Sequence, residues 1–323
     1  MRNGTRRLVR ALMSASVLSL VAAAGWSQSL TWLGTLGGTL SWAYGVSANG
    51  VVVGSAYNAA GQWRAFRWTA SGGMRDLGTL GGSESGALGV SADGAVVVGR
   101  ADNAAGQTRA FRWTASGVRQ DLGTLPGGNK SLARGVSADG AVVVGRAANA
   151  EGQTRAFRWT ASGGMQDLGT LGGGYSQAWG VSADGSVVVG DARNAEGRWH
   201  AFRWTASGGM EDLNTTYASL LTNGSRLREA RAISPDGRYI VGWGYNAASG
   251  LSEEAFLLDT GPRCTAHNGD VDGNGCVDDA DLLAVLFAFG STGSTLGRED
   301  TNCDGTVDDA DLLEVLFNFG GGC

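Results

Sequence analysis

The chain has 323 residues and a formal net charge of −5, and it contains 55 glycines but only three prolines. Abundant glycine without proline excludes a collagen-like or proline-rich chain and favours many tight turns between short strands. Charged residues make up 17% of the chain, below the usual ~25%, so long solvated helices are not expected.

The charge is unevenly distributed along the chain. From residue 264 to the end there are twelve acidic residues and one basic residue, Arg298, whereas the middle of the chain is nearly neutral. Because the chain has no basic stripe, no nucleic acid is expected as a partner. The acidic end is expected either to repel its surroundings or to be neutralised by cations.

Residues 1–27 have the pattern of a signal peptide. A basic segment at 2–10 precedes a mostly apolar segment at 11–23 and then small residues where cleavage would occur. The apolar segment is too short to span a membrane comfortably, and no other segment could cross one. We expect an exported protein, secreted or attached to the cell surface, with no membrane span in the mature chain.

Residues 28–261 contain a repeat. The sequence AFRW occurs four times at intervals of 45, 46 and 45 residues, and a degenerate fifth copy follows. The copies begin at Ala65, Ala110, Ala156, Ala201 and Ala255. A GVSADG-type segment precedes each copy, and an Asp-Leu pair follows each of the first four.

Each repeat is expected to form four short strands. The Asp-Gly pair after GVS favours a tight hairpin turn, and the valine run after it suits a strand covered on both faces. The AFRW and Asp-Leu segments supply the third and fourth strands. Four strands in about 45 residues are typical of a propeller blade. The predicted fold is an all-β, five-bladed β-propeller, with an open β-solenoid as the alternative.

The two ends of the repeat array favour closure. The fifth repeat stops at Asp259 without an Asp-Leu strand, and residues 30–36 before the first repeat resemble the missing strand. If residues 30–36 complete the fifth blade, the ring closes without unpaired sheet edges.

The combination of LGTLGG, a GVSADG turn, a VVVG strand and [HR]AFRW resembles the HAF family of probable extracellular repeats. The resemblance covers roughly residues 30–260, and the triplet His-Ala-Phe itself occurs at His200. It implies an exported repeat protein. It implies no reaction, because the family is defined by its repeat.

Residues 264–323 contain two loops with the spacing of EF-hand calcium sites. Oxygen ligands at positions 1, 3, 5, 7 and 12 of a twelve-residue loop, with glycine at position 6, are the calcium-binding pattern. The predicted ligands are Asp270, Asp272, Asn274, the Cys276 carbonyl and Asp281, then Asp300, Asn302, Asp304, the Thr306 carbonyl and Asp311. Such hard ligands predict two Ca²⁺ ions.

This tandem, with one helix expected after each loop from near Asp279 and Asp309, resembles a type I dockerin. The resemblance implies docking to a cohesin-like partner. The chain has Asp-Ala at loop positions 10 and 11, where cellulosomal dockerins usually have a Ser/Thr pair, so a cell-envelope partner is the alternative. The apolar helix residues either bury one another or form a docking surface. We expect the acidic domain to fold on binding calcium.

All four cysteines lie in this last segment, at Cys264, Cys276, Cys303 and Cys323. An even number in a small exported module predicts two disulfides, for which three pairings exist. A clasp between Cys264 and Cys323 is the favoured pairing. Zinc is the alternative, but no CxxC spacing supports it.

A ligand site in the propeller should use positions that differ between repeats, because residues present in every blade serve the architecture. Just before the GVS segment these positions are Tyr44, Arg134, Trp179 and Arg231, and two residues earlier they include Gln177 and Glu229. Such aromatic and basic side chains could bind a glycan or a peptide.

The sequence offers little for catalysis. The two histidines, His200 and His267, have no plausible serine or cysteine partner. We therefore expect a non-catalytic binding, adhesion or scaffold protein. The alternative is a polysaccharide-acting enzyme, a glycosidase or lyase, with a pair of carboxylates among residues such as Glu84, Glu196 and Glu229.

Overall fold

The computed structural model describes residues 28–261, 268–292, 296–303 and 306–322. The predicted signal peptide, the predicted ligand Asp304 and the predicted Cys264–Cys323 clasp lie outside the described residues.

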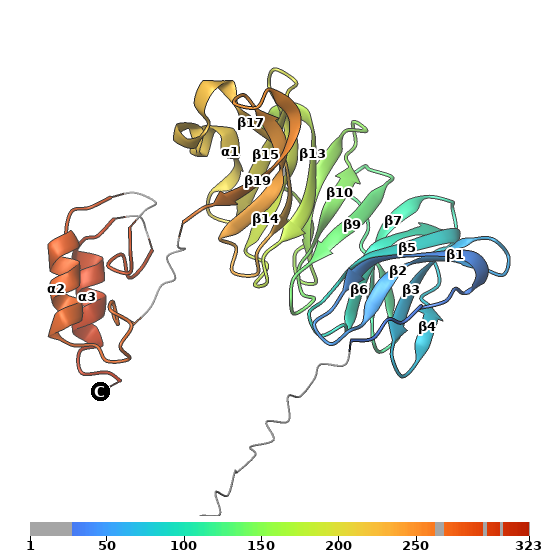
Figure 1. Cartoon of the computed structure of the whole chain (residues 1–323), viewed down its shortest axis with the longest axis horizontal. Helices are drawn as coiled ribbons and strands as arrows, with labels where there is room; N and C mark the ends of the chain where they lie inside the picture. Colours follow the sequence, from blue (N-terminus) through green and yellow to red (C-terminus); the bar gives the residue numbers. More distant parts are fainter. Residues whose placement is uncertain (1–27, 262–267, 293–295, 304–305, 323) are drawn as a thin grey trace, which may run out of the picture. The chain divides into compact units, whose positions relative to one another are not determined.

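The repeats form five antiparallel sheets that follow one another in chain order (Figure 1). The first four sheets have four strands each and the fifth has three. The strands are β1 (Gly37–Val46), β2 (Val52–Asn58), β3 (Trp63–Thr69) and β4 (Gly73–Asp76); β5 (Gly81–Val90), β6 (Val96–Asn103), β7 (Thr108–Thr114) and β8 (Arg119–Asp121); β9 (Ser131–Val136), β10 (Val143–Ala148), β11 (Thr154–Thr160) and β12 (Gly164–Asp167); β13 (Gly172–Val181), β14 (Val187–Asn194), β15 (Trp199–Thr205) and β16 (Gly209–Asp212); and β17 (Arg226–Ile233), β18 (Tyr239–Asn246) and β19 (Leu251–Asp259). The helix α1 (Leu213–Thr216) and two 3₁₀ turns precede β17. The predicted all-β fold class is confirmed.

The repeated polar residues build the turns. In the second repeat the buried hydroxyl of Ser91 donates to Asp93 Oδ1 at 2.6 Å and accepts the amide of Val96, so the Ser-Ala-Asp-Gly turn is closed by its own side chains. Gly94 follows with φ +69°, a conformation that glycine adopts without strain. The third and fourth repeats contain the same bonds.

Backbone hydrogen bonds between these turns connect all five sheets. The amide of Ala48 donates to the carbonyl of Ala92, Ala92 donates to Ala138, Ala138 to Ala183, and Ala183 to Pro235. The arginines of the first three AFRW segments, Arg67, Arg112 and Arg158, add a second link, whereas Arg203 donates to Glu211 of its own sheet. Arg67, for example, donates from Nε to the carbonyl of Gly94 in the next sheet. The repeat therefore specifies the junctions between sheets as well as the strands.

Apolar clusters fill the four junctions between consecutive sheets. The junction of the second and third sheets contains Val98, Leu125, Val143 and Phe157, all at most 2% exposed, together with the AFRW tryptophan Trp159. The other three junctions have equivalent clusters. Trp113 and Trp204 pack likewise, so three of the four AFRW tryptophans lie between sheets as predicted, while Trp68 of the first sheet is only part-buried.

The predicted latch is absent from the described structure. Residues 28–35 form no strand, Leu36 bridges to Asn58 within the first sheet, and the fifth sheet ends at β19. The physical reason lies in the neighbouring sequence. In other repeats the fourth strand ends in an aspartate whose carboxylate accepts the amide of the glycine two residues later, as Asp76 does for Gly78, whereas Trp32 stands at the equivalent position here.

The C-terminal segment contains two helices, α2 (Asp279–Ala288) and α3 (Asp309–Phe317), which pack against each other. Both begin where the sequence predicted. Asp278 and Asp308 cap them, each with a reciprocal capping box to the aspartate three residues later. Val277, Val285, Val307 and Val315 form the core and are at most 1% exposed.

Candidate functional site

Three of the four predicted ligand-binding residues of the sheets come together in a stack. The guanidinium carbons of Arg134 (β9) and Arg231 (β17) lie 3.6 and 3.9 Å from the ring centroid of Trp179 (β13). Two groups this close to one centroid must occupy opposite faces, because on one face they would overlap. The indole is therefore sandwiched between cations, and neither face is left for a ligand.

Tyr44, the fourth predicted residue, lies elsewhere. It is half-exposed on β1, two sheets before the strand of Arg134. Nearby on the first sheet, Trp63 packs against Trp42 and Tyr57, with ring centroids 4.7 and 4.1 Å apart. The structure thus joins Arg134, Trp179 and Arg231 but leaves Tyr44 outside their cluster.

The N–H group at the edge of the sandwiched indole is hydrogen-bonded to a buried carboxyl group. Trp179 Nε1 donates to Asp191 Oδ1 at 2.6 Å, and Gln177 Nε2 donates to the same oxygen at 3.1 Å. Asp191 is 2% exposed. Burial raises the pKa of Asp191 above its usual value, although the Trp179 and Gln177 hydrogen bonds and the nearby arginines oppose the rise.

A second buried carboxyl group faces the same cavity. Glu229 on β17 is 9% exposed and pairs with Arg231. Its pKa is raised by burial first and by the charge of Asp191 second. The cavity measures about 230 Å³ and is lined by Tyr175, Gln177, Asp191, Trp199, Arg228, Glu229 and Trp243. It lies at the junction of the fourth and fifth sheets.

Aromatic rings and arginines surround this cavity. Arg228 lies over Trp243 and Arg193 over Trp199, each with its guanidinium carbon 4.7 Å from the ring centroid. Tyr175 meets Trp199 edge-on at 4.9 Å. A neighbouring cavity of about 250 Å³ shares Trp199 and Arg228 and adds Arg198, Arg226 and Tyr245. The two cavities, together termed the β13–β18 site, combine ring faces, carboxylates and guanidinium groups.

The residues of this site occupy positions that vary between repeats. Asp191 pairs across its sheet with Gln177, and the equivalent pairs are Trp42 with Ser55, Gly86 with Arg100, Leu132 with Arg146, and Glu229 with Trp243. Asp191, Trp199 and Trp243 escaped prediction because only the first strand of each repeat was compared. Their variability on the second and third strands is the signal that could have found them.

The repeated ionic positions have structural roles. Asp212 Oδ2 lies 2.6 Å from His200 Nδ1, and the equivalent pairs in earlier repeats are Arg64 with Asp76 and Arg109 with Asp121. Burial pushes the pKa of Asp212 upward, but hydrogen bonds from His200 and Asn214 outweigh it and the pKa is lowered. His200 therefore occupies a repeat position, as predicted.

The first predicted calcium loop gathers its carboxylates. Ligand oxygens of Asp270, Asp272 and Asp281 all lie within 4.8 Å of one another. Asp281 is fully buried, and its oxygens accept the amides of Val271, Asp272 and Asp278. Burial alone would raise the pKa of Asp281, but these amide bonds outweigh it and the pKa is lowered. Asn274 Oδ1 accepts the amide of Cys276, closing the bend. Three carboxyl groups this close fit a divalent cation.

The second loop places its last predicted ligand in the same way as the first. Asp311 is fully buried and accepts the amides of Thr301, Asn302 and Asp308, which correspond one for one to the donors around Asp281. The predicted ligands Asp300, Asn302 and Thr306 lie on this loop, while Asp304 is outside the described residues. The last ligands of the two loops, Asp281 and Asp311, therefore take equivalent positions.

Part of the apolar surface of the helices remains uncovered within this module. The exposed side chains come in pairs 30 residues apart: Leu283 and Leu313, Leu286 and Leu316, Phe287 and Phe317, Phe289 and Phe319. Phe287 and Phe317 are 88% and 83% exposed. The helices thus bury the valine core and still present the apolar residues that a docking surface requires.

Comparisons with known proteins return structures with a related fold. Neither protein-family models nor curated proteins gave a match. Among solved structures, a putative TolB from Agrobacterium tumefaciens is similar over 68% of this chain and 77% of its own, with TM-score 0.47 and 17% identity. TolB from Acinetobacter baumannii is similar over 65% of this chain, which spans about half (49%) of that protein, with TM-score 0.45 and 15% identity.

The β-propeller domain of the Trilobed protease from Pyrococcus furiosus is similar over 68% of this chain and 70% of its own, with TM-score 0.44 and 12% identity. These likenesses concern architecture alone. Among the residues that the structure describes, no helix is long and apolar enough to cross a membrane.

Proposed function

We propose that this chain is an exported, non-catalytic binding protein whose sheets bind carbohydrate at the β13–β18 site. The observation that carries the proposal is the lining of that site, in which the rings of Trp199 and Trp243 lie beside the buried carboxyl groups of Asp191 and Glu229. Aromatic rings pack against the apolar faces of sugar rings, and carboxyl and amide groups bind hydroxyls. A peptide is the alternative ligand.

A glycan array with the full chain tests this proposal. We expect selected oligosaccharides to bind and Trp199→Thr to weaken binding about tenfold or more, since a ring face is removed. The matched control is Trp63→Thr, because Trp63 occupies the equivalent position in the first sheet. If no carbohydrate binds the wild type, or if both variants bind as it does, the proposal fails.

A polysaccharide-acting enzyme is the second candidate, and one observation favours it. Asp191 and Glu229 line one cavity, and both have a raised pKa, as a general acid requires. Mass spectrometry of a bound oligosaccharide separates the two functions. A binding protein returns the ligand intact, whereas an enzyme releases fragments and Glu229→Gln abolishes their release.

The C-terminal segment is proposed to be a dockerin-like module that binds two Ca²⁺ ions and attaches the protein to a partner. The paired carboxylate loops and the exposed apolar pairs along α2 and α3 support this proposal. The partner is a cohesin-like protein or a component of the cell envelope. Capture of an envelope protein with calcium, lost with chelator and with Phe317→Ser, is the expected result.

Closure of the five sheets into a propeller ring is also a proposal. Apolar residues are exposed on both terminal sheets, Val46 on β1 and Val241 and Leu257 on β18 and β19. If the terminal sheets meet, these residues become buried. A disulfide formed within one chain between cysteines at positions 46 and 257 would support closure. Formation of that disulfide only between chains would contradict it.

A further inference from the structure

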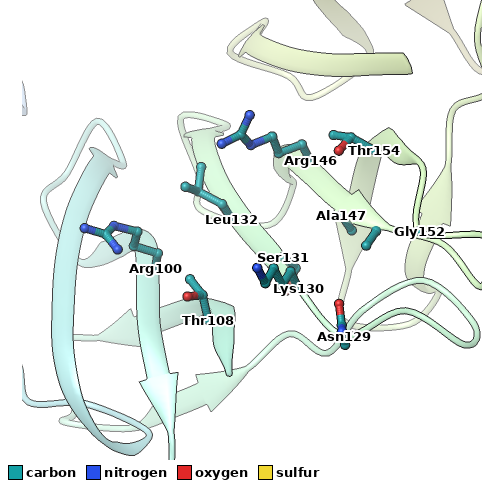
Figure 2. Close-up of a pocket in the computed structure, with 11 residues that line it drawn as sticks. Arg100, Thr108, Asn129, Lys130, Ser131, Leu132, Arg146, Ala147, Gly152 and Thr154 are labelled. Carbon is teal, nitrogen blue, oxygen red and sulfur yellow. The ribbon is translucent and has the colours of Figure 1, made fainter. Parts of the chain in front are cut away.

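The junction of the second and third sheets contains a larger cavity than the β13–β18 site. It measures about 590 Å³, within the range of about 300–1,000 Å³ typical of small-molecule sites. Its lining residues are Arg100, Thr108, Asn129, Lys130, Ser131, Leu132, Arg146, Ala147, Ala148, Gly152 and Thr154. Figure 2 shows Arg100 and Arg146 on strands of two adjacent sheets, with Leu132 between them.

The lining carries three cationic side chains and no carboxylate. Within the described ranges, no ion pair involves Arg100, Lys130 or Arg146. The carboxylate hydrogen-bonded to a lining residue is Asp102, which accepts the hydroxyl of Thr108 at 3.2 Å. Cations without ionic partners around one cavity favour an anionic ligand.

The cationic side chains occupy positions at which the residue type differs between repeats. Arg100 and Arg146 occupy the cross-strand position that holds Ser55 in the first sheet and Asp191 in the fourth. Lys130 directly precedes Ser131, the serine that accepts the amide of Ala110 as its counterparts do in neighbouring repeats. The fold therefore does not require positive charge here, and the same positions form the β13–β18 site in another junction.

Neutral hydrogen-bonding groups complete the lining. Thr108, Asn129 and Thr154 offer hydroxyl and amide groups suited to sugar hydroxyls, and the volume far exceeds that of a lone sulfate. Arg146 also connects this cavity to the β13–β18 site, because its Nη1 donates to the hydroxyl of Tyr175 at 3.1 Å. One extended ligand could therefore contact both places.

We propose that this cavity binds the carboxylate or sulfate group of an acidic carbohydrate, whose neighbouring sugar occupies the β13–β18 site. This inference rests on the proposed carbohydrate binding and specifies its substrate class. Arg100 and Arg146 bind the anionic group, Lys130 adds charge at the mouth, and the threonines bind hydroxyls.

Calorimetry of the full chain with tetragalacturonate, a sulfated chondroitin tetrasaccharide, neutral cellotetraose and inorganic sulfate tests the proposal. We expect one acidic oligosaccharide to bind at least about tenfold more tightly than the neutral one, and added salt to reduce this difference. Arg100→Gln should reduce the affinity for the acidic oligosaccharide about tenfold and so remove most of its advantage over the neutral one. Arg75→Gln, which removes an equal charge from an exposed position on β4, is the control.

Each outcome decides between the claims. If the neutral oligosaccharide binds as tightly as the acidic ones, or if Arg100→Gln and Arg75→Gln behave alike, the acidic site is overturned while carbohydrate binding stands. If inorganic sulfate binds as tightly as the acidic oligosaccharide, the cavity is a site for free anions and the carbohydrate assignment is overturned. If no oligosaccharide binds, both proposals fail.

Discussion

Arg146 donates from Nη1 to the hydroxyl of Tyr175 at 3.1 Å, across the junction of the third and fourth sheets. Arg146 lines the cationic cavity, and Tyr175 lines the cavity that contains Asp191 and Glu229. This one bond connects the walls of the two proposed binding places.

The bond between Arg146 and Tyr175 predicts energetic coupling. Tyr175→Phe removes the acceptor and keeps the ring against Trp199, while Arg146→Gln removes the charged donor. In a double-mutant cycle followed by denaturant unfolding, we expect a coupling of about 0.5–1.5 kcal/mol. Additive effects of the two substitutions would show that the bond contributes nothing to the folded state.

Asp191 predicts a specific dependence of stability on pH. Its pKa is raised in the folded state, so its contribution to stability is complete below the usual value for aspartate and is lost as pH rises through the raised value. Asn at position 191 stays neutral and keeps an acceptor for Trp179. The stability of Asp191→Asn relative to the wild type should therefore rise as the pH increases above the usual pKa of aspartate.

Unfolding in urea at several pH values measures this difference. The control is Asp102→Asn on β6, two residues after Arg100, which occupies the position equivalent to Asp191. If the difference in stability between Asp191→Asn and the wild type stays constant with pH, burial does not raise the pKa of the Asp191 carboxyl group.

Because its indole is sandwiched between two arginines, replacing Trp179 should lower the stability of the protein and not only its binding of a ligand. Trp179→Ala leaves Arg134 and Arg231 without their shared ring and Asp191 without a donor, which should cost about 2–4 kcal/mol. Trp179→Phe keeps an aromatic ring and should cost less. Equal stability of Trp179→Ala and the wild type, measured by thermal unfolding, would show that the stack is not structural.

Replacing Ser85 measures how much a repeated serine that connects two sheets contributes to stability. Its buried hydroxyl accepts the amide of Ala65 at 2.9 Å and donates to the carbonyl of Gly78 at 2.6 Å. Ser85→Ala leaves a buried amide without a partner and should cost about 1–3 kcal/mol. Exposed Ser83→Ala is the control, and an equal effect of the two would reject the role.

The two acidic loops predict independent calcium sites. Asp281→Asn should remove one ion from the binding stoichiometry measured by calorimetry, and Asp311→Asn should remove the other. Asp279→Asn removes the same charge from outside the predicted ligand set and should leave the stoichiometry unchanged. Unchanged stoichiometry in both ligand variants would contradict the assignment.

Much of the architecture could be predicted because the same sequence pattern occurs in several repeats. The GVSADG and AFRW segments recur with fixed spacing, so strand order, the hairpin turns and the tryptophan packing followed from comparing copies. The latch at residues 30–36 was predicted from likeness to another strand, and likeness alone does not decide which edge a strand pairs with. Leu36 forms the same bridge as Leu80 and Leu171, and residues 28–35 form no strand.

The site could be predicted only in part. Tyr44, Arg134, Trp179 and Arg231 were expected at one site, and the structure joins Arg134, Trp179 and Arg231 but not Tyr44. Their stacking on one another depends on side-chain geometry across three sheets, which the sequence does not contain. Trp199 lies opposite Arg193 on the neighbouring strand, and Trp243 lies opposite Glu229. These pairings depend on the strand register, which only the folded sheets show.

The central claim is that residues shared by the repeats build the sheets and residues that vary between them bind the ligand. Trp199 and Phe202 lie three residues apart on β15. The position of Trp199 varies, because Thr108 and Thr154 occupy it in other repeats. The position of Phe202 is shared, because Phe111 and Phe157 occupy it there. Thermal unfolding and oligosaccharide titration of Trp199→Thr and Phe202→Ala test the claim most directly. We predict that Trp199→Thr keeps the melting temperature within a few degrees and loses binding, while Phe202→Ala, which empties a buried position, lowers the melting temperature markedly. Full binding by Trp199→Thr, or an equal loss of stability in both variants, would contradict it.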